Sequence, residues 1–399
     1  MSALASIVCL SPQPWDVDLP TNRQQIMRRA AARGHDVLYV ETGDFAGKHL
    51  WRWLRRRPGG RAARRLFRAE PVAPGIRVRN ALNVLPWGHR LRLACAVNAG
   101  LTSRVVRRAV RRMSPPVVLW LYDPSCAGMI GRCGEIFAVY DCVDDHAAVA
   151  AYDPRVRSLV AAGDARAARE ARLVFTTTSV LLERHRRANP ATVLVRNVGD
   201  YEHFAPAADR ALAAPDVASL PRPVIGFTGN LMTSKVDFAL LDHLARARPA
   251  WTIALVGPVR PDAQRDVERL GTLSNVHVLG HRPYDDVPRY VAGFDVGLCP
   301  YTWTEVNRSC FPLKLFEYLA AGKPVVVSGT PDVGELRLEP DVVVADGHDA
   351  FLLAIEEALA PSAPQDVARR QRIAAANSWE TRVGRLLELV SRELDEVRG

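Results

Sequence analysis

Residues 311–328 read FPLKLFEYLAAGKPVVVS, and this stretch carries the main signal for the fold. Lys314 and Glu317 are three positions apart in an otherwise apolar helical pattern, so they share one helix face. Gly322 stands where a left-handed residue ends a helix, and the following valines predict a buried parallel strand. A cation and a carboxylate beside a strand end suit a ligand with phosphates and hydroxyls. The alternative is an amphipathic helix with two solvated charges.

Strand-like and helix-like segments alternate along the rest of the chain. Apolar runs at residues 6–10, 36–41 and 117–122 are separated by helical patterns, and the alternation restarts at residue 224. Between them, residues 205–223 are rich in Ala, Pro and Asp, which is typical of a linker. The length of 399 residues also favours two domains. We therefore predict an α/β protein with two Rossmann-like domains facing a cleft, with ligands at the carboxyl ends of the strands.

The composition is that of a cytoplasmic protein. No apolar run approaches the roughly 18 residues of a membrane span, and the N-terminus lacks the basic region of a signal peptide. The seven cysteines are odd in number and include no Cys-x-x-Cys pair. We expect reduced thiols and no zinc site.

The net charge of +10 is concentrated in the N-terminal half. Residues 48–68 contain nine Lys or Arg and residues 90–112 contain seven Arg, with no acidic residue in either stretch. Trp51, Trp53 and Trp87 lie within or beside them, a combination that suits an anionic membrane surface. Nucleic acid also fits the charge, but the chain has no known nucleic-acid-binding motif. Solvated, arginine-rich surface helices remain the alternative.

Six motifs resemble those of GT-B glycosyltransferases, in particular the bacterial family-4-like group that acts on cell-wall and exopolysaccharide precursors. They are RGHDVLYVE (33–41), VYDCVDD (139–145), RNVGDYEHF (196–204), GFTGN (226–230), FDVGLCPY (294–301) and the stretch 312–327. The resemblance implies an acceptor-binding domain, a linker, a nucleotide-sugar-binding domain and a C-terminal helix that crosses back onto the first domain. The expected bounds are 1–204, 205–223, 224–377 and 378–399.

The chain departs from this family at two positions. Many members have two glutamates eight positions apart; the second corresponds to Glu317, but the first is Ser309 here. An Arg common after the first strand of the second domain is replaced by Asn230, whereas the Lys five positions later is retained as Lys235. The chain is also similar to the glucuronosyltransferase of xanthan synthesis, an inverting enzyme. Retaining and inverting chemistry therefore both remain open.

The resemblance assigns donor-binding roles to residues of the second domain. Glu317 is expected to accept hydrogen bonds from the two ribose hydroxyls. Lys314 is expected to neutralise the departing diphosphate. The other expected donor contacts are Gly229, Asn230, Lys235 and Tyr301.

The acceptor side is expected in the first domain. An inverting enzyme needs a carboxylate to deprotonate the acceptor hydroxyl, and Asp144 is the expected base, with Asp145 second and His146 as an alternative. The same acidic cluster also suits a helix cap. The expected acceptor contacts are Thr21, Asn22, Arg23 and Asp123.

The function expected from the sequence is metal-independent transfer of a hexosyl group, because no Asp-x-Asp motif stands at a donor position. No resident cofactor is expected, and a UDP-sugar is the expected donor. The expected acceptor is a lipid-linked or cell-envelope glycan at the inner membrane face. Three alternatives are a soluble natural-product acceptor, an epimerase of nucleotide sugars and a catalytically idle nucleotide-sugar-binding protein. Nucleic acid is not an expected partner.

Overall fold

The computed structural model describes residues 5–18, 20–44, 46–47, 60–86, 90–148, 153–304, 307 and 309–399. The chain forms two compact units, each described by itself. Unit 1 is Met1–Arg196 together with Val383–Gly399, and unit 2 is Asn197–Arg382. Most of the first basic stretch, including Trp51 and Trp53, and also Trp87, lies outside the described residues.

Unit 1 is built on a sheet of eight described strands. In spatial order they are β3 (Glu70–Ala73), β4 (Ile76–Asn80), β2 (Val37–Glu41), β1 (Ser6–Ser11), β5 (Val117–Leu121), β6 (Phe137–Cys142), β7 (Leu173–Thr176) and β8 (Thr192–Leu194). All neighbours are parallel except β3 and β4. Strands β1, β5 and β6 are buried along their whole length, because helices cover both faces of a parallel sheet. The chain order reverses between β1 and β5.

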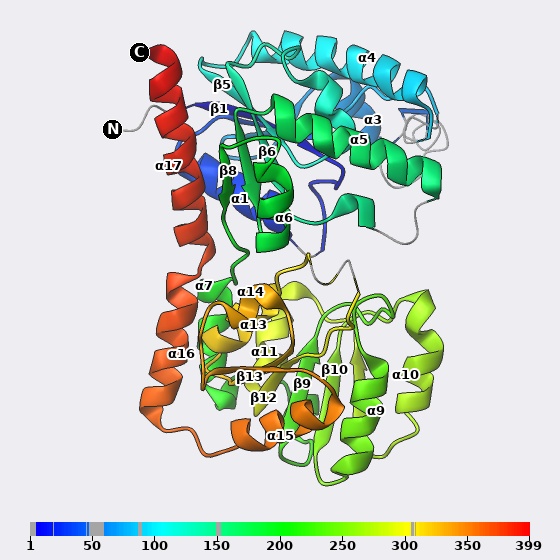
Figure 1. The fold of residues 1–399 in the computed structure, drawn as a ribbon, viewed down its shortest axis with the longest axis vertical. Coiled ribbons are helices and arrows are strands. Elements are labelled where there is room, and N and C mark those ends of the chain that lie inside the picture. Colours follow the sequence, from blue (N-terminus) through cyan, green and yellow to red (C-terminus); the bar gives the residue numbers. More distant parts are fainter. Residues whose placement is uncertain are drawn as a thin grey trace. The chain divides into compact units, whose positions relative to one another are not determined.

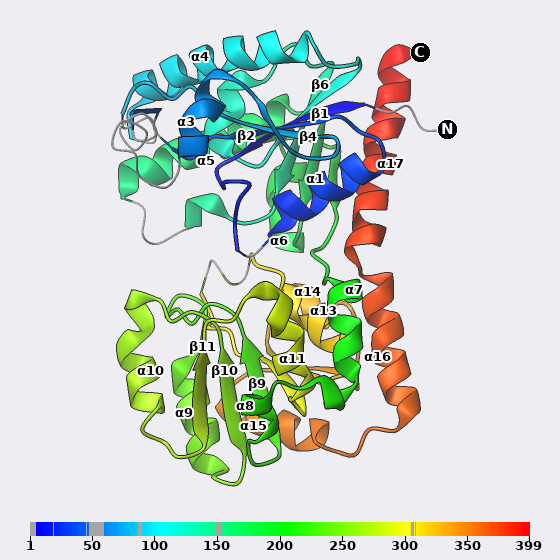
Figure 2. The ribbon, with the colours of Figure 1, turned by 180° about the vertical axis from the view of Figure 1, so that it is seen from behind.

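The helices of unit 1 come from both ends of the chain (Figures 1 and 2). They are α1 (Asn22–Ala32), α3 (Gly60–Phe67), α4 (Arg92–Val110), α5 (Pro154–Glu170), α6 (Ser179–Arg186), the 3-10 helices η1 (Pro124–Met129) and η2 (His146–Ala148), and most of α17 (Trp379–Arg398). Helix α17 begins in unit 2, and from Val383 onward it belongs to unit 1. There Glu393 pairs with Arg172 at 2.5 Å. Helix α17 lies within residues 378–399, for which a helix crossing back onto the first domain was expected.

Unit 2 has a second parallel sheet. Its strands, in spatial order, are β11 (Val276–Gly280), β10 (Thr252–Val256), β9 (Val224–Thr228), β12 (Val296–Cys299), β13 (Val325–Ser328) and β14 (Val342–Ala345). All the pairings are parallel. The chain order reverses between β9 and β12. The predicted pair of Rossmann-like, parallel-sheet domains is confirmed.

Two cores pack on the opposite faces of this sheet. The helices of unit 2 are α7 (Tyr201–Phe204), η3 (Ala205–Ala208), η4 (Arg210–Leu212), α8 (Pro215–Ala218), α9 (Phe238–Ala247), η5 (Pro261–Ala263), α10 (Gln264–Leu270), η6 (Tyr284–Asp286), α11 (Val287–Ala292), α13 (Leu313–Ala320), α14 (Pro331–Gly334), α15 (His348–Ala358) and α16 (Pro364–Ala376). One core holds α11 and α13, and the other holds α9, α10 and α15. Residues 205–223, expected as a linker, fold as η3, η4 and α8. Their Ala207 and Val217 belong to the first core.

The predicted helix and strand in residues 311–328 are confirmed. Helix α13 spans Leu313–Ala320, and β13 follows at Val325. Gly322 has φ +68°, which favours glycine, and the backbone N–H of Lys323 donates to Tyr318 O at 2.9 Å. These features form the left-handed cap that ends the helix.

A glycine inside β9 allows an aromatic ring to pack against the sheet. A Cβ atom built on Gly226 would lie 2.2 Å from the ring of the fully buried Phe294. We therefore expect Gly226→Ala to destabilise the protein by about 1–3 kcal/mol through overpacking, measured as a lower melting temperature. Gly384→Ala is the control, because a Cβ atom on this helical glycine would meet no neighbouring atom of the described residues within 4 Å. It should stabilise by about 0.5–1 kcal/mol, and equal effects of the two changes would contradict the packing argument.

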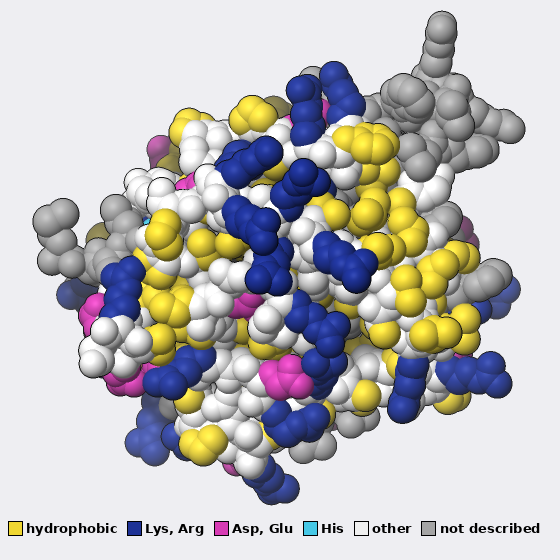
Figure 3. Space-filling model, turned by 90° about the horizontal axis from the view of Figure 1, so that it is seen from above, with side chains coloured by type: hydrophobic (Ala, Val, Ile, Leu, Met, Phe, Trp, Pro, Cys, Tyr) yellow, Lys and Arg dark blue, Asp and Glu magenta, His cyan; other side chains and the backbone are white. Residues whose placement is uncertain are grey.

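The outer face of unit 1 around α4 combines basic and apolar side chains. Figure 3 looks onto the side of unit 1 that carries α4, where a band of Lys and Arg runs beside hydrophobic side chains. Leu93 is 76% exposed and Leu91 51% exposed. The exposed arginines of this region are Arg90, Arg92, Arg104, Arg107, Arg108, Arg111 and Arg112. No helix in the described part of the chain is long and apolar enough to cross a membrane.

Candidate active site

Glycine residues lie at the carboxyl ends of three neighbouring strands of unit 2, so the backbone there carries no side chain of its own. Gly229 follows β9 with φ +143°, and Gly257 follows β10 with φ +146°. Gly229 N–H donates to Val256 O at 2.8 Å, and Gly257 N–H donates to Gly280 O at 2.8 Å. A Cβ atom on Gly257 would lie 1.9 Å from Gly229 O. The two turns pack closely against each other at a positive φ, so replacing either glycine by a residue with a side chain would cause strain. A ligand therefore has direct access to their backbone, beside the point where the strand order reverses.

The side chain of Lys314 lies across the first of these turns. A Cβ atom on Gly229 would lie 2.5 Å from Lys314 Cε and 2.9 Å from Nζ. The ammonium is 6.0 Å from the centre of the Phe227 ring. Lys314 belongs to the first turn of α13, so the helix start places its charge at the end of β9. Two residues predicted from separate motifs, Gly229 and Lys314, are therefore in contact.

Glu317 follows one turn later on α13 and is half-buried. Burial raises the pKa of its carboxyl group, the charge of Lys314 opposes that effect, and Asp200 adds to it. Gly199 packs on this turn, since a Cβ there would lie 2.9 Å from Glu317 N. The carboxylate thus stands among charged groups in a partly desolvated place, which is common at functional sites.

Two residues near Glu317, Asp200 and His203, were not predicted as site residues, and Tyr284 lies beside them. Tyr284 Oη donates to Asp200 Oδ2 at 3.1 Å, and the Tyr284 ring stacks on His203 at 4.4 Å. His203 Nε2 is 3.0 Å from Tyr284 O, and a carbonyl only accepts, so Nε2 carries the proton. His203 and Asp200 both act on the pKa of Glu317. The motif 196–204 contains two of these residues, but no spacing in the sequence relates them to a helix more than 100 positions later.

Tyr318 fixes α13 against β9. It is fully buried, and its hydroxyl accepts a hydrogen bond from Thr228 N at 2.8 Å. Gly297 in β12 makes room for the ring, because a Cβ there would lie 2.4 Å from it. The start of α13, which carries Lys314, is thereby held at the end of β9.

The remaining predicted donor residues lie in the loops after β9 and β12. Tyr301 pairs with Val236 as an isolated bridge, and burial raises the pKa of its hydroxyl well above the usual value. Lys235 Nζ is 4.0 Å from Cys310 Sγ. Asn230 is exposed beside Gly229. Lys235 and Tyr301 thus belong to adjacent loops, whereas Asn230 has an exposed side chain.

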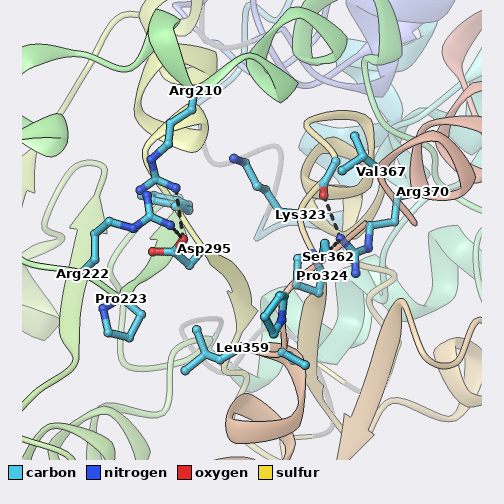
Figure 4. Close-up of a pocket in the computed structure, with 15 residues that line it drawn as sticks. Arg210, Arg222, Pro223, Asp295, Lys323, Pro324, Leu359, Ser362, Val367 and Arg370 are labelled. Atoms are coloured by element: carbon cyan, nitrogen blue, oxygen red, sulfur yellow. Dashed lines mark hydrogen bonds and ion pairs between the residues drawn. The ribbon is translucent and has the colours of Figure 1, made fainter. Parts of the chain in front are cut away.

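A separate hollow of unit 2 lies at the amino ends of the strands, opposite the glycine turns (Figure 4). Its volume is about 500 Å³. Arg222 pairs with Asp295, and the other cations that line the hollow donate to carbonyls at helix C-termini. Lys323 Nζ donates to Ala292 O at 3.0 Å, Arg210 to Gly293 O at 2.8 Å, and Arg370 to Gly322 O at 3.0 Å. Positive side chains at helix C-termini stabilise those ends, so we interpret this hollow as structural.

In unit 1, the predicted acceptor residues lie around the carboxyl ends of β1 and β5. Thr21 caps α1, where its N–H donates to Gln24 Oε1 at 3.0 Å, and Asn22 is buried beside it. The Arg23 guanidinium lies 5.2 Å from the centre of the Tyr122 ring.

Asp123 lies two residues after the end of β5, and two short hydrogen bonds hold its carboxylate. It accepts from Thr42 Oγ1 at 2.6 Å and from Ser125 N at 2.9 Å. The second bond caps η1, and the first ties the end of β5 to the end of β2. The structure therefore brings Arg23 and Asp123 to the strand-order reversal of unit 1, where ligands of such sheets bind.

The two candidate bases after β6 have different environments. Asp145 is buried, its Oδ2 is 2.6 Å from Arg184 Nη2, and its Oδ1 accepts from Ala148 N at 3.2 Å. Burial alone would raise the pKa of Asp145, but the ion pair and the backbone donors outweigh it and lower the pKa. Asp145 therefore caps η2. Asp144 is exposed and His146 is half-buried.

Residues 222–361 match the model of the family described as glycosyl transferases group 1. The chain is 34% identical over 160 residues to a Bacillus subtilis (strain 168) protein named as the teichuronic acid biosynthesis glycosyltransferase TuaH. That match covers 39% of this chain and 40% of TuaH. The chain thus matches about 40% of the length of this curated relative.

Two solved structures are similar over nearly the whole chain. Anabaena HepE in complex with UDP and glucose has a TM-score of 0.67 at 19% identity, covering 97% of this chain and 99% of that one. Sucrose-phosphate synthase from Thermosynechococcus elongatus has a TM-score of 0.71 at 16% identity, covering 98% and 100%. At these identities the likeness shows the fold, which is the GT-B fold expected from the sequence.

Proposed function

We propose that this protein is a glycosyltransferase that moves a sugar from a nucleotide diphosphate sugar to an acceptor hydroxyl. The observation that carries the proposal is the contact of Lys314 with the bare turn at Gly229, with Glu317 one helical turn away. A cation for a diphosphate and a carboxylate for ribose hydroxyls thus stand at the strand-order reversal of unit 2. The family match of residues 222–361 includes all three residues.

The proposed donor interactions follow from the chemistry of these groups. Glu317 accepts hydrogen bonds from the ribose hydroxyls with its two carboxylate oxygens. Lys314, assisted by Lys235, neutralises the charge that develops on the diphosphate as the glycosidic bond breaks, so that no metal ion is needed. Gly229 and Asn230 face the donor through their backbone, and Tyr301 packs beside the phosphates.

The proposed acceptor side belongs to unit 1. Asp144 deprotonates the acceptor hydroxyl, because its carboxylate is exposed, whereas Asp145 is engaged by Arg184. Thr21, Asn22, Arg23 and Asp123 bind the acceptor at the strand ends. This assignment makes the reaction inverting, since a base is used and no covalent intermediate forms.

The donor and the acceptor class are proposed from the similar proteins. HepE was solved with UDP and glucose, which supports a UDP-sugar as donor. TuaH is named for teichuronic acid biosynthesis, which supports a cell-envelope glycan as acceptor. An epimerase of nucleotide sugars would turn over its substrate without any acceptor. Incubation of UDP-sugars alone separates that activity from transfer.

A thermal-shift screen with UDP, GDP, dTDP and their sugars tests the donor assignment. A ligand at about 100 times its Kd stabilises the folded state by about 2.7 kcal/mol, so the correct nucleotide should raise the melting temperature clearly at millimolar concentration. We expect UDP and a UDP-sugar to give the largest shifts. If none of the nucleotides shifts the melting temperature, the donor-site assignment is wrong.

We also propose that unit 1 docks on an anionic membrane surface through the region around α4. Exposed Leu91 and Leu93 provide apolar contact, and the surrounding arginines provide attraction to acidic headgroups. This arrangement would bring the enzyme to a lipid-linked acceptor at the cytoplasmic face. A soluble acceptor requires no such surface.

Charge reversal at Arg104, Arg107 and Arg108 should weaken binding to anionic vesicles. Each basic residue near such a surface contributes about 1 kcal/mol, so losing three lowers the partition coefficient on the order of 100-fold. The measurement is vesicle sedimentation at low salt. The matched control reverses Arg260, Arg265 and Arg269, which are exposed in unit 2, and should bind like the wild type. Failure of the wild type to sediment would remove the docking proposal and favour a soluble acceptor.

A further inference from the structure

Three side chains with metal-ligating atoms meet in the interior of unit 1. Cys142 is the last residue of β6, Asp164 lies on α5 and His185 lies on α6. One ligand atom from each lies within 4.8 Å of the other two. Asp164 Oδ1 is 3.5 Å from His185 Nε2 and 3.9 Å from Cys142 Sγ. The sheet topology thus brings a thiol, an imidazole and a carboxylate close together.

The imidazole nitrogen in this group makes no hydrogen bond of normal geometry, because its contact with Asp164 Oδ1 is long at 3.5 Å. His185 is 2% exposed, and its buried Nε2 has no hydrogen-bond partner among the residues that the structure describes. A buried polar atom without a partner costs about 1–3 kcal/mol, so native structures rarely keep one without a reason. The nitrogen faces the carboxylate and the thiol, which are the groups that accompany histidine in zinc sites.

The carboxylate is oriented by a neighbour in the way that metal ligands usually are. Tyr140 Oη donates to Asp164 Oδ1 at 2.6 Å. Such outer partners fix a ligand's direction and are part of most metal sites. The Asp164 side chain is 16% exposed, so the group has a route to solvent.

We propose that Cys142, Asp164 and His185 form a binding site for a zinc ion. Mixed sulfur, nitrogen and oxygen ligands suit zinc, and tetrahedral bonds of about 2.0–2.3 Å place ligand atoms roughly 3.3–3.6 Å apart. The ligand atoms lie within 4.8 Å of one another, so they must move inward when the ion binds. Solvent fills the fourth position. The ion ties the end of β6 to α5 and α6, directly before the loop with Asp144. It is separate from the donor site in unit 2.

Metal titration of the full-length protein tests this proposal. After removal of metal with EDTA, we expect zinc to bind at one equivalent by calorimetry and to raise the melting temperature. Cobalt should give the near-ultraviolet absorption of a thiolate–cobalt bond. Cys142→Ser and His185→Gln should each weaken binding by at least about 100-fold. Cys133→Ser is the control, because it removes another fully buried thiol outside the group and should bind normally.

X-ray absorption at the zinc edge keeps the test independent of the folding of the variants. The wild type should show one sulfur at about 2.3 Å and lighter ligands at about 2.0–2.2 Å. Three results would overturn the proposal: no zinc binding by the wild type, a zinc shell without sulfur, or zinc affinity that Cys142→Ser leaves unchanged.

Discussion

Glu317→Ala should weaken the binding of the donor nucleotide by at least about 100-fold. The wild-type carboxylate is proposed to accept two hydrogen bonds from the ribose, and each hydrogen bond to a charged group contributes about 1.5–3 kcal/mol. Isothermal calorimetry with UDP measures the loss directly. Glu317→Gln keeps the shape and one acceptor oxygen, so its loss should be smaller.

The control for this change is Glu357→Ala, which removes an exposed carboxylate from α15. It should bind UDP like the wild type. Unchanged affinity in Glu317→Ala would place the ribose elsewhere.

The same carboxylate should set the pH dependence of donor binding. Burial raises the pKa of Glu317 above its ordinary value of 4.5, so the carboxylate is protonated earlier than usual as the pH falls. Nucleotide affinity is therefore present above the raised pKa and lost as the pH falls through it, in a window above pH 4.5. In Glu317→Gln this dependence should disappear.

Asp144→Asn should reduce kcat by about 100-fold to 10,000-fold, because general-base catalysis contributes a factor of that size. The affinity for UDP should not change, since the proposed donor residues lie in the other unit. A sugar-transfer assay and calorimetry on the same preparation separate the two effects. Full activity of Asp144→Asn would move the base elsewhere or favour a retaining mechanism.

Asp145→Asn provides the comparison with the neighbouring carboxylate. It breaks the contact with Arg184 at 2.6 Å, so we expect a lower melting temperature rather than a purely kinetic defect. Glu183→Gln, an exposed change on α6, should alter neither quantity. Loss of transfer in Asp145→Asn with an unchanged melting temperature would identify Asp145 as the base.

The fold was predictable because local patterns and tertiary burial agree. The valines after Pro324 and the apolar run at 117–121 are buried on both faces, as their composition predicts for central parallel strands. The cap at Gly322 follows from one residue type at one position. Residues 205–223 fold as short helices in unit 2, and their composition gave no sign of this because Ala and Pro fit both a linker and short helical turns.

The residues of the candidate site could be grouped from the sequence only where one motif contains them. Lys314 and Glu317 share one helix, so their spacing carries information. The packing of α7 and η6 brings Asp200, His203 and Tyr284 close to Glu317. No periodic pattern in the sequence predicts that arrangement. The three proposed zinc ligands are also about 20 positions apart, outside any metal-binding spacing, and only the sheet order brings them together.

The two units differ in how the chain encodes them. Unit 2 is one uninterrupted segment, residues 197–382, whereas unit 1 requires residues from both ends of the chain. The apolar side of α17 at Val383, Leu386 and Val390 is buried. A fragment that stops at residue 382 would expose the surface that this helix covers. We therefore expect unit 2 to be exchangeable between related chains as a single segment with two junctions, with the last 17 residues staying with the recipient.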